Sequence, residues 1–158
     1  MRVRELVRKR KALVAQTEWS HNDLPPRHAP VYTRTKPIRA GWQWRSARAI
    51  AGQVTFILLA ECNIGRENYK AVLMIETEGG YSVVARFEDH GSHPGAHVHT
   101  HCERSGIQIE GEGFDNLVRI PSATARHRRV NAWTQDRFWR AAQRLFRIET
   151  DDGPLFTS

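Results

Sequence analysis

The pattern of hydrophobic positions predicts three consecutive β-strands in the middle of the chain. Val54 to Asn63 is apolar and rich in β-branched residues, and Tyr69 to Glu78 and Tyr81 to Glu88 have a similar character. Gly79 and Gly80 separate the last two strands, and two adjacent residues that accept positive φ are a strong signal for a hairpin. We therefore expect an antiparallel meander.

Histidines alternate with small or apolar residues in the next segment, which predicts a fourth strand from Ala96 to Cys102. Successive side chains of a strand point to opposite faces, so one face would be small and core-like. The other face would carry three imidazoles: His97, His99 and His101. The glycine- and proline-rich turn before this strand holds two more histidines, His90 and His93.

The strand from Tyr81 to Glu88 would lie beside the histidine strand. Strict alternation gives it one apolar face: Tyr81, Val83, Ala85 and Phe87. Its other face would hold Ser82, Val84, Arg86 and Glu88. Either Arg86 or Glu88 would therefore neighbour the imidazoles, according to a strand register that the sequence leaves open.

The first fifty residues are basic and largely irregular. Apolar residues recur at helical spacing over residues 2–16, which predicts a basic amphipathic helix. From Ser20 to Gly41 the chain carries four prolines and almost no periodicity, so an extended arm or linker is expected. Trp42 and Trp44 follow between arginines, where aromatic rings more often anchor a fold than stack on nucleic-acid bases.

The last strong periodicity runs from about Thr134 to Ile148 and predicts a C-terminal helix packed on the sheet. Its apolar stripe consists of Phe138, Ala141, Ala142, Leu145 and Phe146. Arginines recur on a different face: Arg137, Arg140, Arg144 and Arg147. A second basic group precedes the helix: Arg126, Arg128 and Arg129. These arginines are the candidate nucleic-acid-binding residues.

Together these elements predict an α+β fold with a small antiparallel sheet of four to six strands packed by the C-terminal helix. Residues 1–45 would form a basic N-terminal helix and a proline-rich arm, residues 46–150 a single α+β domain with the His-rich strand, and residues 151–158 a tail. A chain of 158 residues is long enough for one domain core and too short for two comfortable ones.

The net charge of +7 is unevenly distributed along the chain. Lys and Arg dominate the first 50 residues and the segment from residue 126, whereas Asp and Glu dominate residues 51–125. Basic ends favour an anionic partner, either RNA or another nucleic acid, or an acidic protein. The sequence shows neither a membrane span nor a signal-peptide core, so we expect a cytoplasmic protein with reduced cysteines.

Alternating histidines on a strand suit a transition-metal site. Neighbouring imidazoles can converge on one ion such as Zn²⁺, with a carboxylate in the same shell. The candidate metal ligands are His97, His99, His101 and Glu103. The spacing from Gly91 through His97 and His99 to Glu103 also resembles the first cupin motif, although the second motif of that family is matched only loosely.

The same histidines are also suited to RNA cleavage without a metal. Two imidazoles on either side of a phosphate can act as general base and general acid, because a pKa of about 6.5 populates both protonation states near neutral pH. An arginine would stabilise the charge that develops on the phosphate. The candidate catalytic residues are Arg86, His93, His97, His99 and His101.

Residues 69–103 resemble TumE-like toxins of bacterial toxin–antitoxin systems. The resemblance rests on the hairpin, the closely spaced histidines, the His93-Pro94 step and the run Arg86-Phe87-Glu88-Asp89. It implies a short antiparallel sheet, a histidine-rich turn and a closing helix. It also implies action on RNA and silencing by an antitoxin protein, so the leading hypothesis is a toxin-like ribonuclease.

Two other hypotheses stay open at this point. One is the transition-metal-binding domain that uses the same histidines. The other is a non-catalytic module, monomeric or homo-oligomeric, that binds nucleic acid or a protein partner through its arginines while the histidines tune affinity with pH. RNA cleavage that depends on the histidines would distinguish the nuclease from the binding module.

Overall fold

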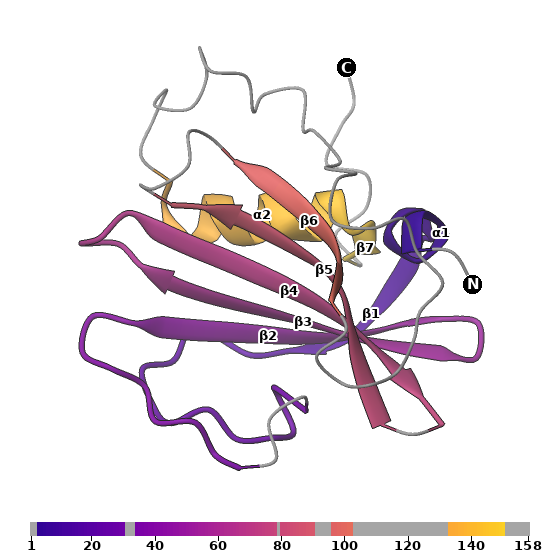
Figure 1. Ribbon diagram of the computed structural model, residues 1–158, viewed down its shortest axis with the longest axis horizontal. Helices are drawn as coiled ribbons and strands as arrows, with labels where there is room; N and C mark the ends of the chain where they lie inside the picture. The colour runs from indigo at the N-terminus through magenta and orange to yellow at the C-terminus, as the bar shows by residue number, and fades with distance from the viewer. Residues whose placement is uncertain (1–2, 31–33, 79, 91–95, 103–132, 151–158) are drawn as a thin grey trace.

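The chain folds around one seven-stranded sheet that carries a helix on one face (Figure 1). The computed structural model describes residues 3–30, 34–78, 80–90, 96–102 and 133–150, of which residues 3, 4, 97 and 99–102 are given by their backbone. The elements are α1 (Val3–Arg8), β1 (Lys11–Gln16), β2 (Gln43–Ala51), β3 (Val54–Asn63), β4 (Asn68–Thr77), β5 (Gly80–Asp89), β6 (His97–Cys102), α2 (Gln135–Leu145) and β7 (Ile148–Glu149). The α+β class and the C-terminal helix are thus confirmed.

The sheet is a meander with one added strand at its edge. Strands β1 to β6 lie in chain order, each antiparallel to its neighbours, and β7 pairs parallel with β1. The four strands predicted between residues 54 and 102 lie within one residue of their expected ends, and the hairpin between β4 and β5 is confirmed. Local β-propensity and turn chemistry therefore agree with the final pairing here.

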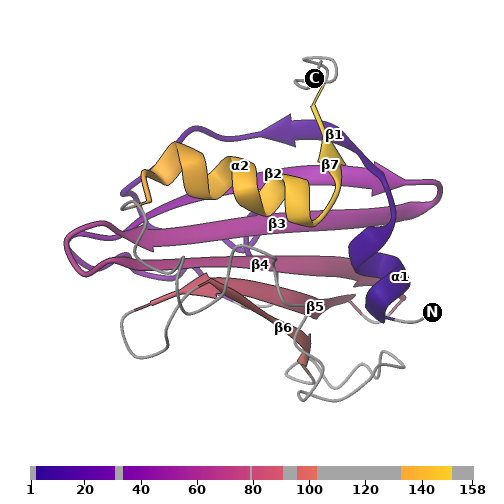
Figure 2. The same ribbon diagram turned by 90° about the horizontal axis from the view of Figure 1, so that it is seen from above.

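Helix α2 buries an aromatic core against one face of the sheet, which we call the helix face (Figure 2). Phe138 is fully buried, and its ring stacks on Phe87 with the centroids 4.8 Å apart. The rings of Tyr69 and Trp133 contact the same side chain, with centroids at 5.3 and 5.6 Å. Thr134 caps the helix by accepting a hydrogen bond from a backbone N–H in its first turn.

The opposite face, which we call the arm face, is partly covered by a proline-rich arm, residues 17–30 and 34–42, seen on the other side of the sheet from α2 in Figure 1. Backbone bridges join Ser20 to Trp44 and Leu24 to Lys36. A second apolar cluster is buried between arm and sheet: Leu24, Ala29, Trp44, Ile57, Leu59, Val72, Met74 and Val83. The described part of this arm therefore packs on the sheet.

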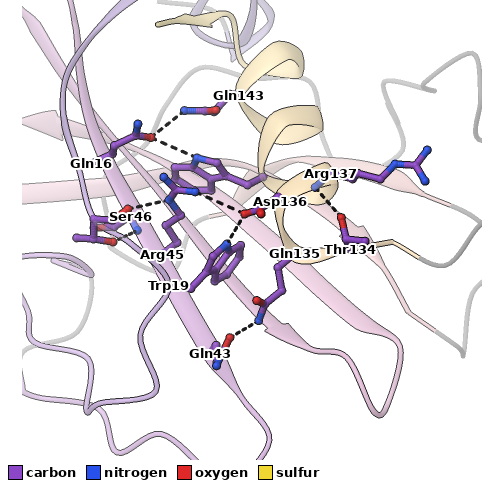
Figure 3. Close-up of polar contacts among 12 residues, drawn as sticks. Gln16, Trp19, Gln43, Arg45, Ser46, Thr134, Gln135, Asp136, Arg137 and Gln143 are labelled. Carbon is purple, nitrogen blue, oxygen red and sulfur yellow. Dashed lines mark hydrogen bonds and ion pairs between the residues drawn. The ribbon is translucent and has the colours of Figure 1, made fainter.

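Polar contacts tie the N-terminal end of α2 to the segment around β1 and β2 (Figure 3). Asp136 accepts a hydrogen bond from the Trp19 indole at 3.2 Å and pairs with Arg45 at 3.8 Å. The Arg45 guanidinium also lies over the ring of Trp139, 5.0 Å from its centroid. The Trp139 indole in turn donates to the side chain of Gln16. Such directional contacts specify how the helix is placed on the sheet, in addition to apolar packing.

A β-bulge in β5 changes the faces that strict alternation predicts for that strand. Leu73 of β4 pairs with Ala85, but the next residue, Met74, pairs with Val83, so Val84 is left as the extra residue. Val84 and Ala85 are both buried in the helix-face core, whereas Val83 belongs to the arm-face cluster. The predicted grouping of Val83 with Ala85 is therefore wrong.

Both ends of the chain contribute strands where the sequence predicted helix. The N-terminal helix ends at Arg8, and Lys11–Gln16 pairs with β2 and β7 as β1. Helix α2 ends at Leu145, and Ile148–Glu149 forms β7. In each case strand pairing overrides a helical periodicity. The boundary predicted at residue 45 falls within β2, so the N-terminal segment belongs to the same sheet.

Lys11 holds a buried ammonium group between the ends of the two helices. Its side chain donates hydrogen bonds to the carbonyl oxygens of Val7, Lys9 and Phe146, at 3.2, 2.7 and 2.7 Å. These carbonyls lie at or just beyond the C-terminal ends of α1 and α2, where the backbone lacks partners within the helix. Burial, assisted by the charges of Arg147 and Lys9, lowers the pKa of Lys11 from 10.5 to about 8.

This shift predicts a pH-dependent stability. Between pH 8 and 10.5 the unfolded chain holds a proton on Lys11 that the folded chain has released, so the free energy of unfolding should rise with pH. The contribution should reach about 3 kcal/mol over this window, since one pKa unit corresponds to about 1.36 kcal/mol. Urea unfolding at several pH values should show a free energy of unfolding that rises more steeply with pH in the wild type than in Lys11→Met. An exposed cation of the arm provides a control, Arg39→Met, and parallel curves for all three proteins would contradict the assignment.

Candidate functional site

Strands β5 and β6 bring predicted catalytic residues to adjacent positions. Their backbone pairing sets His99 opposite Arg86 and His97 opposite Glu88. Val98, between the two histidines, is fully buried in the helix-face core, so positions 97 and 99 belong to the arm face. The register that the sequence left open therefore places both Arg86 and Glu88 beside a histidine position.

Several other predicted site residues cannot be placed in the same way. His101 lies in β6 between the backbone pairs Ala85–Thr100 and Val83–Cys102, at the level of the β5 bulge. The following residues lie outside the described residues: His93, Glu103, Arg126, Arg128 and Arg129. Among the residues that the structure describes, no group of three His, Cys, Asp or Glu could hold a metal ion. The metal site at His97, His99, His101 and Glu103 stays a prediction.

Charged side chains form a band across the arm face next to these positions. Backbone pairing sets Glu61 of β3 opposite Lys70 of β4, and Lys70 opposite Glu88 of β5. Cross-strand partners share a face, so the three side chains form one row. We use the name polar band for this row together with the charged groups that contact it: Lys36, Glu61, Lys70, Arg86, Glu88 and His90.

Glu61 is the most enclosed carboxylate of the polar band, with 8% of its side chain exposed. The Lys36 ammonium from the arm lies 2.9 Å from one carboxylate oxygen, and the Lys70 ammonium lies 4.0 Å from the other. A carboxylate this buried requires cationic partners, which the two lysines supply. About a third of each lysine side chain is exposed, so solvent reaches part of both side chains.

Glu88 connects Arg86 to His90 at the end of β5. The Arg86 Nε lies 3.7 Å from one oxygen of the Glu88 carboxylate, and the His90 Nε2 lies 3.5 Å from the other. The carboxylate can thus orient the guanidinium and, when the imidazole is protonated, form an ion pair with it. All three side chains are between 13% and 27% exposed, so they are sheltered and still accessible.

The arginine row of α2 lies on the other side of the sheet. Arg137, Arg140 and Arg144 are exposed, while the opposite side of the helix is buried in the helix-face core. Arg147 follows the helix and is also exposed. The predicted outward arginine row is therefore confirmed as a surface feature, but it does not share a face with Arg86. A nucleic acid held by this row would not lie directly over the polar band.

A serine and a histidine form a hydrogen bond that the sequence alone does not indicate. The Nδ1 of His28 lies 2.7 Å from the Ser46 hydroxyl, and the Arg27 side chain donates to the His28 Nε2 at 3.2 Å. Because Nε2 accepts, the neutral ring carries its proton on Nδ1 and donates to the serine. Burial and the charge of Arg27 lower the pKa of His28, which favours this neutral ring. The pair fixes the arm to β2 and lacks the base that an activated serine needs.

Two further residues with reactive or aromatic side chains are structural. Trp44 is 5% exposed and donates its indole N–H to the carbonyl oxygen of Asn22 at 2.7 Å, so it anchors the arm. Cys62 is fully buried, and burial raises the pKa of its thiol well above the usual range. A buried thiol of this kind is neither a nucleophile nor an open metal ligand.

Comparison of the chain with protein-family models, curated proteins and solved structures gives no match. The resemblance to TumE-like toxins, and the antitoxin partner that it implies, therefore stay expectations from the sequence. Within the described part of the chain, neither helix has the length and apolar character needed to cross a membrane.

Proposed function

We propose that the protein is a metal-independent ribonuclease whose active site lies on the arm face where β5 and β6 pair. The observation that carries the proposal is the backbone pairing of His99 with Arg86 and of His97 with Glu88. This pairing supports a site in which imidazole, guanidinium and carboxylate side chains meet, which are the groups that cleavage of a phosphodiester requires.

The proposed chemistry is an intramolecular transesterification. One imidazole removes the proton of the RNA 2′-hydroxyl, and the 2′-oxygen attacks the adjacent phosphorus. The bond to the 5′-oxygen breaks as a second, protonated imidazole gives that oxygen a proton. The products are a 2′,3′-cyclic phosphate and a 5′-hydroxyl, so the reaction needs no water and no co-reactant. Arg86 would stabilise the additional negative charge on the phosphate oxygens.

The rest of the polar band supports binding of an extended anionic substrate. Lys36 and Lys70 lie on the same face as Arg86 and keep about a third of their side chains exposed. They are therefore available to the phosphates that flank the cleaved bond. Glu88 would hold Arg86 and His90 in place through its two carboxylate oxygens.

The decisive experiment is cleavage of a fluorescent RNA oligonucleotide in excess chelator. We expect cleavage by the wild type, a 2′,3′-cyclic phosphate on the product, and a rate lowered about 10²- to 10⁴-fold in His99→Ala, the range for loss of a general acid or base. His21→Ala is the matched control, because His21 is an exposed histidine of the arm. A substrate with a 2′-deoxy sugar at the cleaved position should be inert, since it lacks the nucleophile.

Other outcomes separate the alternatives. Cleavage that starts only when Zn²⁺ or another transition metal replaces the chelator would favour the metal-binding hypothesis. Intact RNA under both conditions, with tight RNA binding, would favour the non-catalytic module. Equal cleavage by the wild type and His99→Ala would remove the proposed mechanism.

A further inference from the structure

The five tryptophans of the chain differ in how the fold uses their indole groups. Four of them donate a hydrogen bond from the indole N–H: Trp19, Trp44, Trp133 and Trp139. Each of these four rings also contacts another aromatic ring. Within the described part of the chain, Trp42 alone has neither an indole hydrogen bond nor a ring contact, and its side chain is partly exposed. Four tryptophans therefore anchor the fold, whereas Trp42 has no structural partner of this kind.

Trp42 follows a tight turn that leads from the arm into β2. Its backbone N–H donates to the carbonyl oxygen of Arg39 at 3.1 Å, and Gly41 adopts a φ of 84°, which favours glycine. A Cβ at Gly41 would lie 3.2 Å from the Nδ2 of Asn63, so the turn is packed closely against the end of β3. The backbone of Trp42 is thus held in place, which reduces the conformational entropy lost when a ligand binds there.

This turn lies next to the polar band. Trp44, two residues after Trp42, is buried in the arm-face cluster, and its backbone pairs with that of Glu61. Positions two residues apart on a strand share a face, so position 42 belongs to the arm face as well. Asn63, which the turn contacts, follows Glu61 by two residues on β3. Trp42 and the carboxylate of the polar band that Lys36 binds therefore occupy neighbouring positions on one face.

Cations accompany Trp42 at this end of the arm face. Arg39 is exposed in the turn itself and has no ion pair among the described residues. Lys70 lies 4.0 Å from Glu61, and about a third of its side chain is exposed. Proteins that bind single-stranded nucleic acid combine such features, because cations attract the phosphates while the bases stack on an aromatic ring. The surroundings of Trp42 therefore suit an unpaired nucleotide.

The proposed cleavage site lies too far from Trp42 for one nucleotide to reach both. β2 and β5 are three steps apart across the sheet, about 14 Å at a strand spacing of about 4.8 Å. Along the strands, Trp42 is level with Asn63 and its partner Asn68. Arg86 pairs with Val72, four residues further along β4, which adds about 13 Å. The direct separation of about 19 Å corresponds to roughly six nucleotides at about 3.4 Å each in a stacked strand, and to fewer in an extended one.

We propose that Trp42 is a stacking platform for an unpaired base of the RNA substrate, several nucleotides from the cleaved bond. The proposal rests on the ribonuclease function for the position of that bond, and it specifies a substrate that is single-stranded between the two positions. Every base has a π-face, so Trp42 would select for an unpaired nucleotide and not for one base.

The test measures binding of a fluorescent 2′-O-methyl RNA of about 12 nucleotides, within the range of sites on single-strand-binding domains. Such an RNA is not cleaved, because every 2′-hydroxyl is blocked. Trp42→Ala should lower the affinity about 5- to 100-fold, the range for the loss of one base stack, and Trp42→Phe should retain most of it. Ile64→Ala is the matched control, since Ile64 is an exposed apolar residue of the next turn, and it should bind like the wild type.

An abasic strand of the same length separates stacking from a structural or electrostatic role. It keeps the phosphates and offers no base, so the wild type and Trp42→Ala should bind it equally. A difference between the two proteins that is as large for the abasic strand as for the RNA would overturn the proposal. Equal affinity of the wild type and Trp42→Ala for the RNA would overturn it too, as would a loss in Trp42→Phe as large as in Trp42→Ala.

The same assay keeps this proposal apart from the ribonuclease function, because it requires no cleavage. Binding that depends on Trp42, without cleavage of unmodified RNA, would remove the ribonuclease and retain the stacking site. Cleavage of unmodified RNA by the wild type, with no effect of Trp42→Ala on binding, would remove the stacking site and retain the ribonuclease. Trp42→Ala should cleave a dinucleotide at the wild-type rate if both proposals hold, since that substrate is too short to reach Trp42.

Discussion

Arg86→Ala is expected to lower the rate of RNA cleavage about 10²- to 10³-fold, the usual effect of removing one group that stabilises transition-state charge. Arg86 lies opposite His99 in the sheet, and its guanidinium is held 3.7 Å from the Glu88 carboxylate. A fixed cation in a sheltered site needs little reorganisation as charge develops on the phosphate. Single-turnover cleavage with excess protein would measure the effect without a contribution from product release.

Two companion variants make this prediction specific. Arg86→Lys should fall between the wild type and Arg86→Ala, because lysine keeps the charge and loses the planar pair of donors. Arg48→Ala is the control, since Arg48 is an exposed arginine of the same arm face, on β2. If Arg48→Ala and Arg86→Ala reduced cleavage equally, Arg86 would only contribute to the general positive potential.

Arg86→Ala should also keep its fold, so that its lower cleavage rate can be assigned to the loss of the guanidinium group. Arg86 is about a quarter exposed, and its removal leaves Glu88 next to His90. A partly exposed ion pair contributes about 0 to 1 kcal/mol, so the free energy of unfolding should change little. Unfolding of Arg86→Ala under the assay conditions would instead identify a structural role.

The central strands could be predicted because their local signals agree with their pairing. β3 and β4 are largely apolar runs, and the hairpin to β5 closes at the pair Thr77–Gly80, where Gly80 has a positive φ. At the ends of the chain the local pattern and the pairing disagree. Residues 11–16 have a helical pattern of apolar residues, yet they form a strand whose partners are 31 or more residues away, as in the Gln16–Ala47 pair, or at the other end of the chain. Such long-range pairing leaves no local signal.

The candidate site also combines features that the local sequence predicts with features that depend on long-range pairing. The histidine strand and the outward arginines follow from periodicity alone, because each depends on residues close in sequence. The pairing of Arg86 with His99 depends on register, and the face of Val83 depends on a bulge, so neither can be derived from alternation. The ion pair between Lys36 and Glu61 joins the arm to β3, and nothing near either residue in the sequence indicates it.

The largest effect on stability is expected from Phe138→Ala. The Phe138 ring is fully buried and contacts three other aromatic rings, those of Phe87, Tyr69 and Trp133. Removing a buried phenylalanine costs about 3 to 5 kcal/mol, the sum of the apolar transfer free energy of the ring and the cavity that remains. The cost should lie at the high end of this range, because the three rings around Phe138 are packed together and have little room to move into the cavity.

Urea unfolding followed by circular dichroism would measure this destabilisation, and the same data would show whether α2 depends on its packing. A helix of 11 residues is marginal in isolation, so a cavity beneath it should reduce helix content before the sheet unfolds. Ile64→Ala is the control for apolar truncation, because the Ile64 side chain is 53% exposed, and it should change the free energy of unfolding by less than about 0.5 kcal/mol. A destabilisation below about 1 kcal/mol for Phe138→Ala, far under the usual cost of removing a buried phenylalanine, would mean that α2 is held mainly by its polar contacts with β1 and β2, and not by the aromatic core.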